Sequence, residues 1–201
     1  MSSRYELTGR TNQKRRTRDA LISAARELLA AGESPTVEQV ADRAAVSRTT
    51  AYRYFTNQRE LIVAVYPQIE APSLIDGDTS GDPLARLDIA LAHLTDQLLT
   101  HEPELRAQLR LSLEADHSAE NLPLRQGRAI GWFEDALAPA RDRLGAKEIH
   151  RLALAIRATC GIEALVWLTD VGGLTRKQAA ELMRRSARTI AAAALDAPQR
   201  E

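Results

Sequence analysis

Apolar residues recur at helical spacing along almost the whole chain of 201 residues, and no segment alternates in the way that a strand does. In residues 17–31 one face of the predicted helix carries Leu21, Ile22, Ala25, Leu28 and Leu29, and Gly32 follows as a stop signal. The same pattern predicts helices over residues 36–43, 47–55, 61–66, 84–101, 103–116, 123–144, 146–171 and 175–196. The chain is therefore predicted to have an all-α fold.

One stretch breaks the helical pattern for longer than the rest. Residues 71–83 read APSLIDGDTSGDP and are rich in Pro, Gly, Asp and Ser, which is typical of a loop. This loop is the best candidate for a domain boundary. We expect a small helical domain at residues 1–70 and a larger helical domain at residues 71–201.

Two short helices within the first domain have the composition of a helix-turn-helix. Thr36-Val-Glu-Gln39 is a capping box that starts the first helix, and Ser47 is a good N-cap for the second. The small side chains of Ala41 and Ala51 allow the two helices to cross closely. The positions expected to face inward are Val40, Ala41, Ala44, Val46, Ala51 and Phe55.

Turning those residues inward leaves polar side chains on the outside of the second helix. Arg48, Thr49, Tyr52 and Arg53 face outward, with Thr50 at the margin. This set suits duplex DNA, because Arg bonds guanine bidentately, a Thr methyl contacts thymine, and Tyr and Thr hydroxyls bond phosphates. From the residues alone, a solvated helix with two chance arginines is the alternative.

The charge distribution favours a polyanion as the partner of the first domain. The net charge is +0, but residues 1–66 hold 11 Lys and Arg against 7 Asp and Glu, a net of +4, and the remainder holds 16 against 20, a net of −4. Residues 1–18 hold six basic residues, among them Lys14, Arg15 and Arg16, and one acid, Glu6. We expect a basic N-terminal arm that contacts DNA; a solvated, disordered tail is the alternative.

Residues 17–66 resemble the DNA-binding domain of the TetR family of transcriptional regulators. The resemblance rests on RDALISAARELLAAG, TVEQVADRAAVSRTTAYRYF and NQRELIVAVY, above all on the Tyr-x-Tyr-Phe ending with a polar turn and Glu-Leu behind it. It implies a homodimer, a helical ligand-binding C-terminal domain, and release from double-stranded operator DNA when a small-molecule effector binds. By position it implies DNA contacts from Thr36, Ser47, Arg48, Thr49, Thr50, Tyr52, Arg53 and Tyr54, with Thr36 and Tyr52 at phosphates.

Two positions depart from the family pattern. Ala45 stands in the turn, where helix-turn-helix proteins often have Gly; if that residue is left-handed, Ala costs roughly 1 kcal/mol. Gln58 stands where the family often has Lys, so we do not expect the family's phosphate contact there, and Arg59 is the alternative donor.

For the second domain we expect a cavity that binds an aliphatic or mixed ligand, because only three aromatic residues lie after residue 66. The candidate lining residues lie on predicted helices and are His93, Leu94, Leu98, Leu109, Leu113, Trp132, Phe133, Leu137, Ile156 and Cys160. The alternative for each of them is ordinary core packing, because apolar helical stripes usually pack.

The last two predicted helices carry stripes of small and apolar residues that suit a dimer interface. The expected interface residues are Gly161, Leu165, Leu168, Ala179, Leu182, Met183, Ser186, Ala187, Ile190 and Ala194. Two such helices and their symmetry mates would form a four-helix interface, as the resemblance implies. Packing onto the rest of a monomer is the alternative.

The residues do not favour other functions. The four histidines lack metal-ligand spacing, and there is no Gly-rich phosphate loop, Ser nucleophile elbow or paired catalytic carboxylates, so we expect no metal, no cofactor and no enzymatic activity. No apolar run approaches the ~18 residues of a membrane span, and the N-terminus lacks the apolar core of a secretory signal. With Cys160 as the sole cysteine, we expect a cytoplasmic protein.

We therefore expect a ligand-responsive, homodimeric transcriptional repressor that binds a palindromic operator. The alternative is a protein–protein interaction module that uses a helix-turn-helix-like fold without binding DNA.

Overall fold

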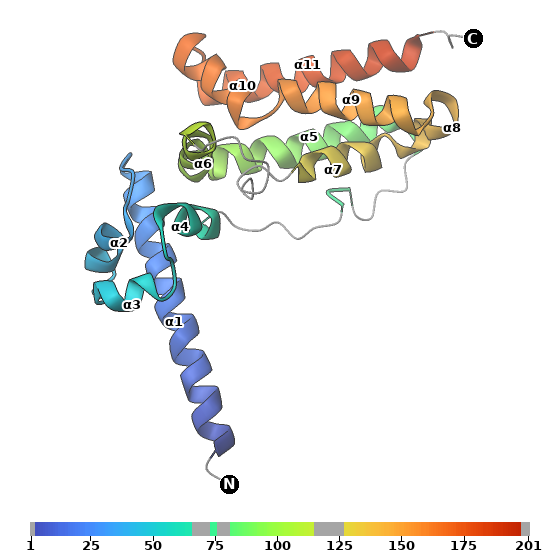
Figure 1. The fold of residues 1–201 in the computed structure, drawn as a ribbon. Helices are drawn as coiled ribbons and strands as arrows, with labels where there is room; N and C mark the ends of the chain where they lie inside the picture. Colours follow the sequence, from blue (N-terminus) through green and yellow to red (C-terminus); the bar gives the residue numbers. More distant parts are fainter. Residues whose placement is uncertain (1–2, 66–72, 76–80, 115–126, 198–201) are drawn as a thin grey trace. The chain divides into compact units, whose positions relative to one another are not determined.

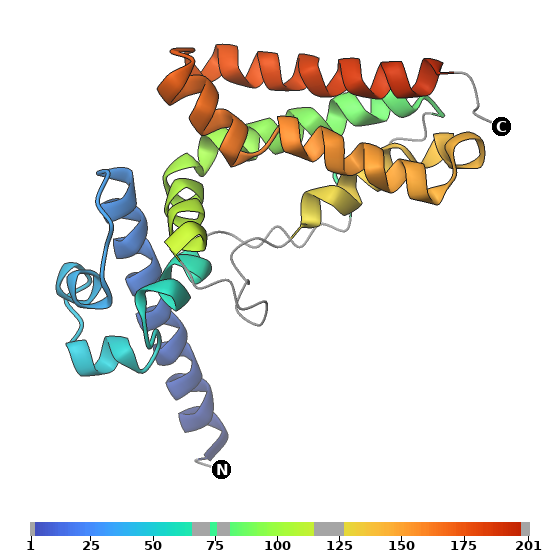
Figure 2. The ribbon, with the colours of Figure 1, turned by 45° about the horizontal axis from the view of Figure 1, so that its top comes forward.

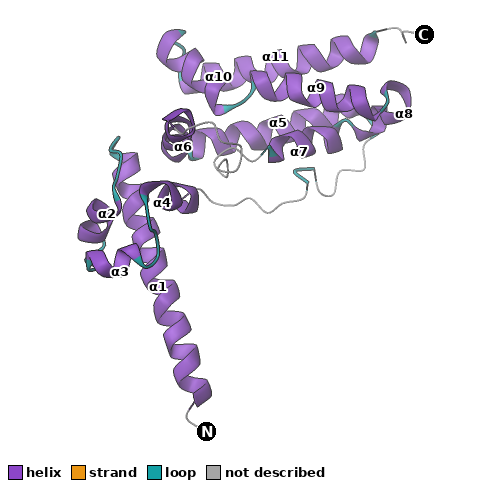
Figure 3. Cartoon of the chain, viewed as in Figure 1, coloured by secondary structure: helices purple, strands orange, loops and turns teal. Residues whose placement is uncertain are grey.

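The computed structural model describes residues 3–65, 73–75, 81–114 and 127–197, and every regular element within these ranges is a helix (Figure 3). The prediction of an all-α fold is confirmed. The chain divides into two compact units, which we call the head (residues 1–68 and 103–125) and the body (residues 69–102 and 126–201). The two predicted domains, residues 1–70 and 71–201, stay a prediction, because residues 103–125 are grouped with the head although they follow the first segment of the body in the sequence.

Helices α1, α2, α3 and α4 lie together in the head (Figure 1), and most of α6 is grouped with them. Their bounds are Ser3–Ala30, Val37–Arg43, Arg48–Tyr52, Gln58–Val65 and Glu102–Glu114. The head core draws apolar residues from all five helices and includes Leu21, Ala25, Leu28, Val40, Ala41, Ala51, Phe55, Leu61, Ile62 and Ala107. Arg26 on α1 donates to the carbonyl oxygen of Val65 at 2.8 and 3.1 Å, which satisfies the C-terminal end of α4.

The first helix is longer than the sequence pattern predicts. It begins at Ser3, whereas the apolar stripe predicts a start near residue 17. Residues 3–16 carry no apolar face, but they include Arg, Lys, Glu, Gln and Leu, which have high helix propensity. A search for an apolar stripe therefore misses this segment, and the predicted basic arm is helical.

The turn between α2 and α3 depends on one left-handed residue. Ala45 has a φ of 53°, and it is the only residue other than Gly with a positive φ among those described. The amide of Val46 donates to Ala41 at 2.9 Å and the amide of Ala45 donates to Asp42 at 3.3 Å, the pattern of a Schellman helix end. The left-handed turn considered from the sequence is thus present, with Ala in the place that Gly usually takes.

The body is built on four helices that pack in a closed ring. These are α5 (Pro83–Thr100), α7 (Arg128–Ala136), α9 (Ala146–Thr159) and α11 (Arg176–Asp196). Helices α5 and α9 each pack against both α7 and α11 (Figure 2). The largest fully buried side chains of this ring include Phe133, Leu87, Leu91, Leu137, Ile149, Ile156 and Met183.

Two long helices predicted for the body are interrupted. The helix expected over residues 123–144 is broken by a 3₁₀ turn at Ala138–Ala140, which contains Pro139, and resumes as α8 (Arg141–Leu144). The helix expected over residues 146–171 breaks at Cys160 and Gly161, continues as α10 (Ile162–Val166) and ends in a π-helical turn at Trp167–Val171. Residues 115–116 and 123–126 of the predicted helices lie outside the described ranges.

The stretch Ala146–Val171 is long and apolar enough, by length and composition alone, to cross a membrane. The core helix of a soluble protein passes the same test, and this stretch contains α9, which packs against α7 and α11. Its apolar character is therefore explained in part by packing, although Trp167 and Val171 are exposed.

Replacing Ala45 with Gly tests the cost of the left-handed turn. We expect Ala45→Gly to raise the free energy of unfolding of the head by up to about 1 kcal/mol, because Gly adopts this conformation without a Cβ clash. Chemical denaturation of the full chain measures the change. The matched control is Ala44→Gly, since Ala44 has an ordinary φ of −80° and should lose stability on the same replacement. A loss of stability in Ala45→Gly would show that the turn is not strained.

Candidate nucleic-acid interface

Helices α2 and α3 cross closely because small residues lie between them. Ala41 on α2 and Ala51 on α3 are both 0% exposed, and Val40 and Phe55 are also buried. Val46, in the turn, packs against the same core. With Ala51 buried, the rest of the short helix α3 presents its other side to solvent, as the sequence predicts.

Hydroxyl side chains cap both helices. Thr36 and Gln39 form the predicted capping box: the Thr36 amide donates to Gln39 at 2.8 Å, and the Gln39 amide donates to Thr36 Oγ1 at 3.3 Å. Ser47 Oγ accepts from the Thr50 amide at 3.3 Å and donates to Thr50 Oγ1 at 2.8 Å. These bonds stabilise the start of α3, which is only five residues long.

The structure brings the predicted DNA-contacting residues of the helix-turn-helix together on and beside α3. The exposed residues are Thr36, Ser47, Arg48, Thr49 and Tyr52, together with Arg53, which follows directly after α3. Thr50 and Tyr54 are half-buried, and Tyr54 packs against the head core. Tyr54 is therefore partly a core residue, while the others remain candidates for contact with DNA.

Two carboxylates that sequence reasoning missed lie against this surface. Asp42 Oδ2 on α2 is 3.4 Å from Nη2 of Arg48, and the hydroxyl of Tyr52 donates to the carboxylate of Glu38, also on α2. That hydrogen bond lowers the pKa of the Glu38 carboxyl and raises the pKa of the Tyr52 hydroxyl. The spacing in the sequence could have indicated these pairs. Glu38 and Asp42 are four residues apart and share one face of α2, and Arg48 and Tyr52 are four residues apart and share one face of α3.

Gln58, at the family position where Lys is common, has a structural role. Its Nε2 donates to the Pro35 carbonyl at 3.0 Å and to Ser34 Oγ at 3.2 Å, which joins the start of α4 to the loop before α2. The side chain is thereby engaged within the head.

The three basic residues of the predicted arm, Lys14, Arg15 and Arg16, lie on α1 and are exposed. Successive residues on a helix point about 100° apart, so these side chains spread around α1. The predicted basic arm is therefore a helix whose three cations point in different directions, and their contact with DNA stays a prediction.

A family model for bacterial regulatory proteins of the tetR family matches residues 21–65, which contain α2, α3, α4 and most of the buried face of α1. Over these residues the chain is similar to the tetR family of bacterial regulatory proteins. The resemblance seen in the sequence is confirmed, and the helix-turn-helix is the DNA-binding element of that family.

Solved structures also match the chain. One of them is the complex of SmeT with triclosan, which is 20% identical, with a TM-score of 0.59 over 92% of this chain and 99% of that one. At this identity the match shows a shared fold. No curated protein matches the chain.

The residues predicted to line a ligand cavity lie in both units of the chain. Leu109 and Leu113 lie on α6 in the head, and Leu113 is 67% exposed, so their part in a ligand cavity stays a prediction. The remaining residues except His93 are buried in the packing of the body: Leu94, Leu98, Trp132, Phe133, Leu137, Ile156 and Cys160. Burial raises the pKa of the Cys160 thiol to about 12, as expected for a buried hydrophobe.

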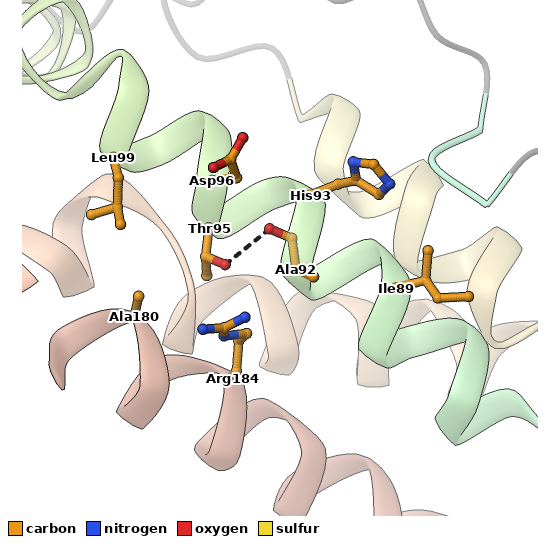
Figure 4. A pocket seen from close by; sticks show the side chains of 8 residues that line it. All are labelled: Ile89, Ala92, His93, Thr95, Asp96, Leu99, Ala180 and Arg184. Atoms are coloured by element: carbon orange, nitrogen blue, oxygen red, sulfur yellow. Dashed lines mark hydrogen bonds between the residues drawn. The ribbon is translucent and has the colours of Figure 1, made fainter. Parts of the chain in front are cut away.

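His93 is exposed and borders an open groove of about 540 Å³ between α5 and α11 (Figure 4). Apolar groove residues are Ile89, Ala92, Leu99 and Ala180, and polar ones are His93, Thr95, Asp96 and Arg184. Thr95 donates to backbone carbonyls of its own helix at 2.8 and 3.1 Å. In the described part of the chain, no cluster of three His, Cys, Asp or Glu side chains is placed to hold a metal.

The predicted dimer stripe is also corrected in part. Gly161, Leu165, Ala179, Met183 and Ala187 are buried within the protomer, so they belong to the core of the body and cannot reach a partner. The half-buried members are Leu168, Leu182, Ser186, Ile190 and Ala194. Sequence reasoning missed Trp167 and Val171, which are 60% and 73% exposed.

Base reading by α3 is tested at Arg48. We expect Arg48→Ala to weaken binding to the preferred DNA site by roughly 1–3 kcal/mol and to relax the preference at one base pair in each half-site. Binding titrations against duplexes with single substitutions measure both effects. Arg43→Ala on α2 is the matched control and should change the affinity for all sequences equally. An unchanged sequence preference in Arg48→Ala would show that Arg48 does not read a base.

Proposed function

We propose that the chain is a homodimeric transcriptional repressor whose two heads bind a palindromic operator. The observation that supports this most directly is α3, which is anchored by the fully buried Ala51 and exposes Arg48, Thr49, Tyr52 and Arg53. A helix anchored on one side and polar on the other fits the major groove, where Arg and Thr side chains distinguish bases. We further propose that it represses transcription while bound and leaves the operator when an effector binds.

For the dimer, we propose a four-helix interface made by α10, the π-helical turn and α11 of each protomer. Trp167 and Val171 expose large apolar surfaces, and Leu168 is half-buried beside them. Helix α11 packs against both α10 and the π-helical turn, and its half-buried Leu182 and Ile190 are candidates for the same interface. Covering exposed Trp and Val side chains favours association, because burial removes apolar surface from water.

For the effector, we propose a small molecule that binds the body and favours a shape in which the heads no longer fit the operator. The groove between α5 and α11 combines apolar residues with His93, Asp96 and Arg184, which suits a molecule with an apolar part and a polar group. The SmeT structure contains the small molecule triclosan, which supports ligand binding by this fold. Any such ligand shifts the equilibrium only by its differential affinity for the two shapes. Thermal-shift screening of small molecules with the full chain tests this part.

We further propose that the protein acts in the cytoplasm, where regulators of this family bind DNA. The rival function is a protein–protein interaction module that never binds DNA. Selection from a pool of random duplexes separates the two, because a regulator enriches one sequence class and an interaction module enriches none.

The basic residues of α1 give a second test of DNA binding. We expect replacement of Lys14, Arg15 and Arg16 by Gln to weaken binding to all duplexes alike and to reduce the slope of log K against log salt, by about 0.9 for each phosphate that is no longer neutralised. Because the three side chains spread around the helix, the reduction should correspond to fewer than three phosphates. Replacing Lys147, an exposed cation of α9 in the body, by Gln is the control. An unchanged slope would show that these residues of α1 do not contact DNA phosphates.

The proposed dimer interface is tested at the two most exposed apolar residues. We expect Trp167→Glu with Val171→Glu to convert the dimer to monomers and to reduce operator affinity strongly, because a single head reads only one half-site. Sedimentation at several concentrations measures the assembly. Ile89→Glu, at an exposed apolar position on α5, is the control and should leave the dimer intact. An intact dimer in the double variant would place the interface elsewhere.

A further inference from the structure

Two side-chain pairs connect α2 to α3 in register. Asp42 pairs with Arg48 at 3.4 Å, and Glu38 accepts a hydrogen bond from Tyr52. All four side chains are on the outside of the head, and both groups of the Arg48–Asp42 pair are about two-thirds exposed, at 65% and 64%. An exposed pair of this kind contributes little to folding stability. Its position beside the proposed base-reading residues suggests a different role.

The Tyr52 hydroxyl cannot serve two acceptors at once. A phenol has one proton to donate, and here that proton is donated to Glu38. A DNA phosphate is only an acceptor, so Tyr52 can donate to a phosphate only after its bond to Glu38 is broken. Glu38 therefore competes directly with the DNA backbone for this hydroxyl.

The guanidinium of Arg48 is in a different situation. It carries five N–H donors, and the contact with Asp42 engages one of its terminal nitrogens, Nη2. If Arg48 moves to a phosphate, it exchanges one anion for another and gains little. If it bonds the O6 and N7 atoms of a guanine, it gains two hydrogen bonds with a neutral partner and can keep its contact with Asp42.

We propose that Asp42 is a specificity-determining residue, which positions Arg48 for a base and withholds it from the phosphates of arbitrary DNA, and that Glu38 withholds Tyr52 from the DNA backbone. The inference rests on the proposed function, because it concerns how the same surface chooses its site. Asp42 acts through Arg48 and lowers the affinity for random sequence more than the affinity for the preferred site. Glu38 acts through Tyr52 and lowers the affinity for both, because a phosphate contact carries no sequence information.

The experiment uses the full chain and two duplexes of equal length, one selected by the wild-type protein from a random pool and one of random sequence. Asp42→Asn should bind the random duplex roughly two- to fivefold more tightly, the range that exposed ion pairs contribute, and should gain less on the selected duplex. Glu38→Gln should strengthen binding to both duplexes equally, because Tyr52 contacts phosphate. Asp42→Asn should also steepen the salt slope on random DNA by about 0.9, because Arg48 then neutralises a phosphate. Glu38→Gln should leave that slope unchanged, because Tyr52 is neutral.

Matched controls separate this role from a general effect of charge. Asp19→Asn and Glu33→Gln remove the same charge from exposed positions elsewhere in the head and should leave the ratio of the two affinities unchanged. In an Arg48→Ala background, Asp42→Asn should lose its effect on the ratio, and in a Tyr52→Phe background Glu38→Gln should no longer strengthen binding to either duplex. Thermal unfolding checks that each variant folds.

Three results contradict the proposal. Asp42 would act by charge alone if Asp42→Asn strengthened binding to both duplexes equally, or if its effect persisted without Arg48. The proposal would also be overturned if Asp42→Asn left the ratio unchanged on a duplex that the wild-type protein does select. Failure of the wild-type protein to select any sequence is a distinct result, which overturns the proposed function and this inference with it.

Discussion

The close crossing of α2 and α3 is the constraint on which the candidate interface depends. The two helices meet through Ala41 and Ala51, and any larger side chain at either position would move α3 away from the core. The turn between them is tight, because Ala45 must adopt a left-handed conformation for the chain to change direction at the end of α2. A helix of five residues would not form alone in water, so this anchoring and the Ser47 cap give α3 its stability.

The sequence predicts the head well because its signals are local. The capping box at Thr36, the N-cap at Ser47 and the buried alanines depend on neighbours within a few residues, and each lies where the pattern places it. The helical start of α1 is the exception, because a polar helix has no apolar stripe to reveal it. The acids Glu38 and Asp42 were also visible in the sequence, yet their importance appears only when α3 lies beside them.

The body is harder to predict because an apolar stripe does not identify what covers it. The stripe through Ala179, Met183 and Ala187 has the composition of a dimer interface, yet α11 buries it against its own ring of helices. An apolar periodicity indicates that one face of a helix is covered. A helix of the same chain and a helix of a second copy can cover that face equally well. The exposed Trp167 and Val171 lie in the π-helical turn, where a regular 3.6-residue pattern fails to place them.

Stability and selectivity make different demands on the same surface. A head selected only for DNA affinity would carry cations and hydroxyls without acidic neighbours, because every unpaired donor adds binding to phosphate. In this head, Asp42 and Glu38 engage an arginine and a tyrosine that DNA would otherwise attract. Such contacts contribute little to the stability of the fold, because Asp42, Arg48 and Tyr52 are exposed to solvent. The free energy of these contacts matters when DNA competes for the same side chains. The difference between a contact with the acid and a contact with DNA then sets how strongly the protein prefers its own site to random sequence.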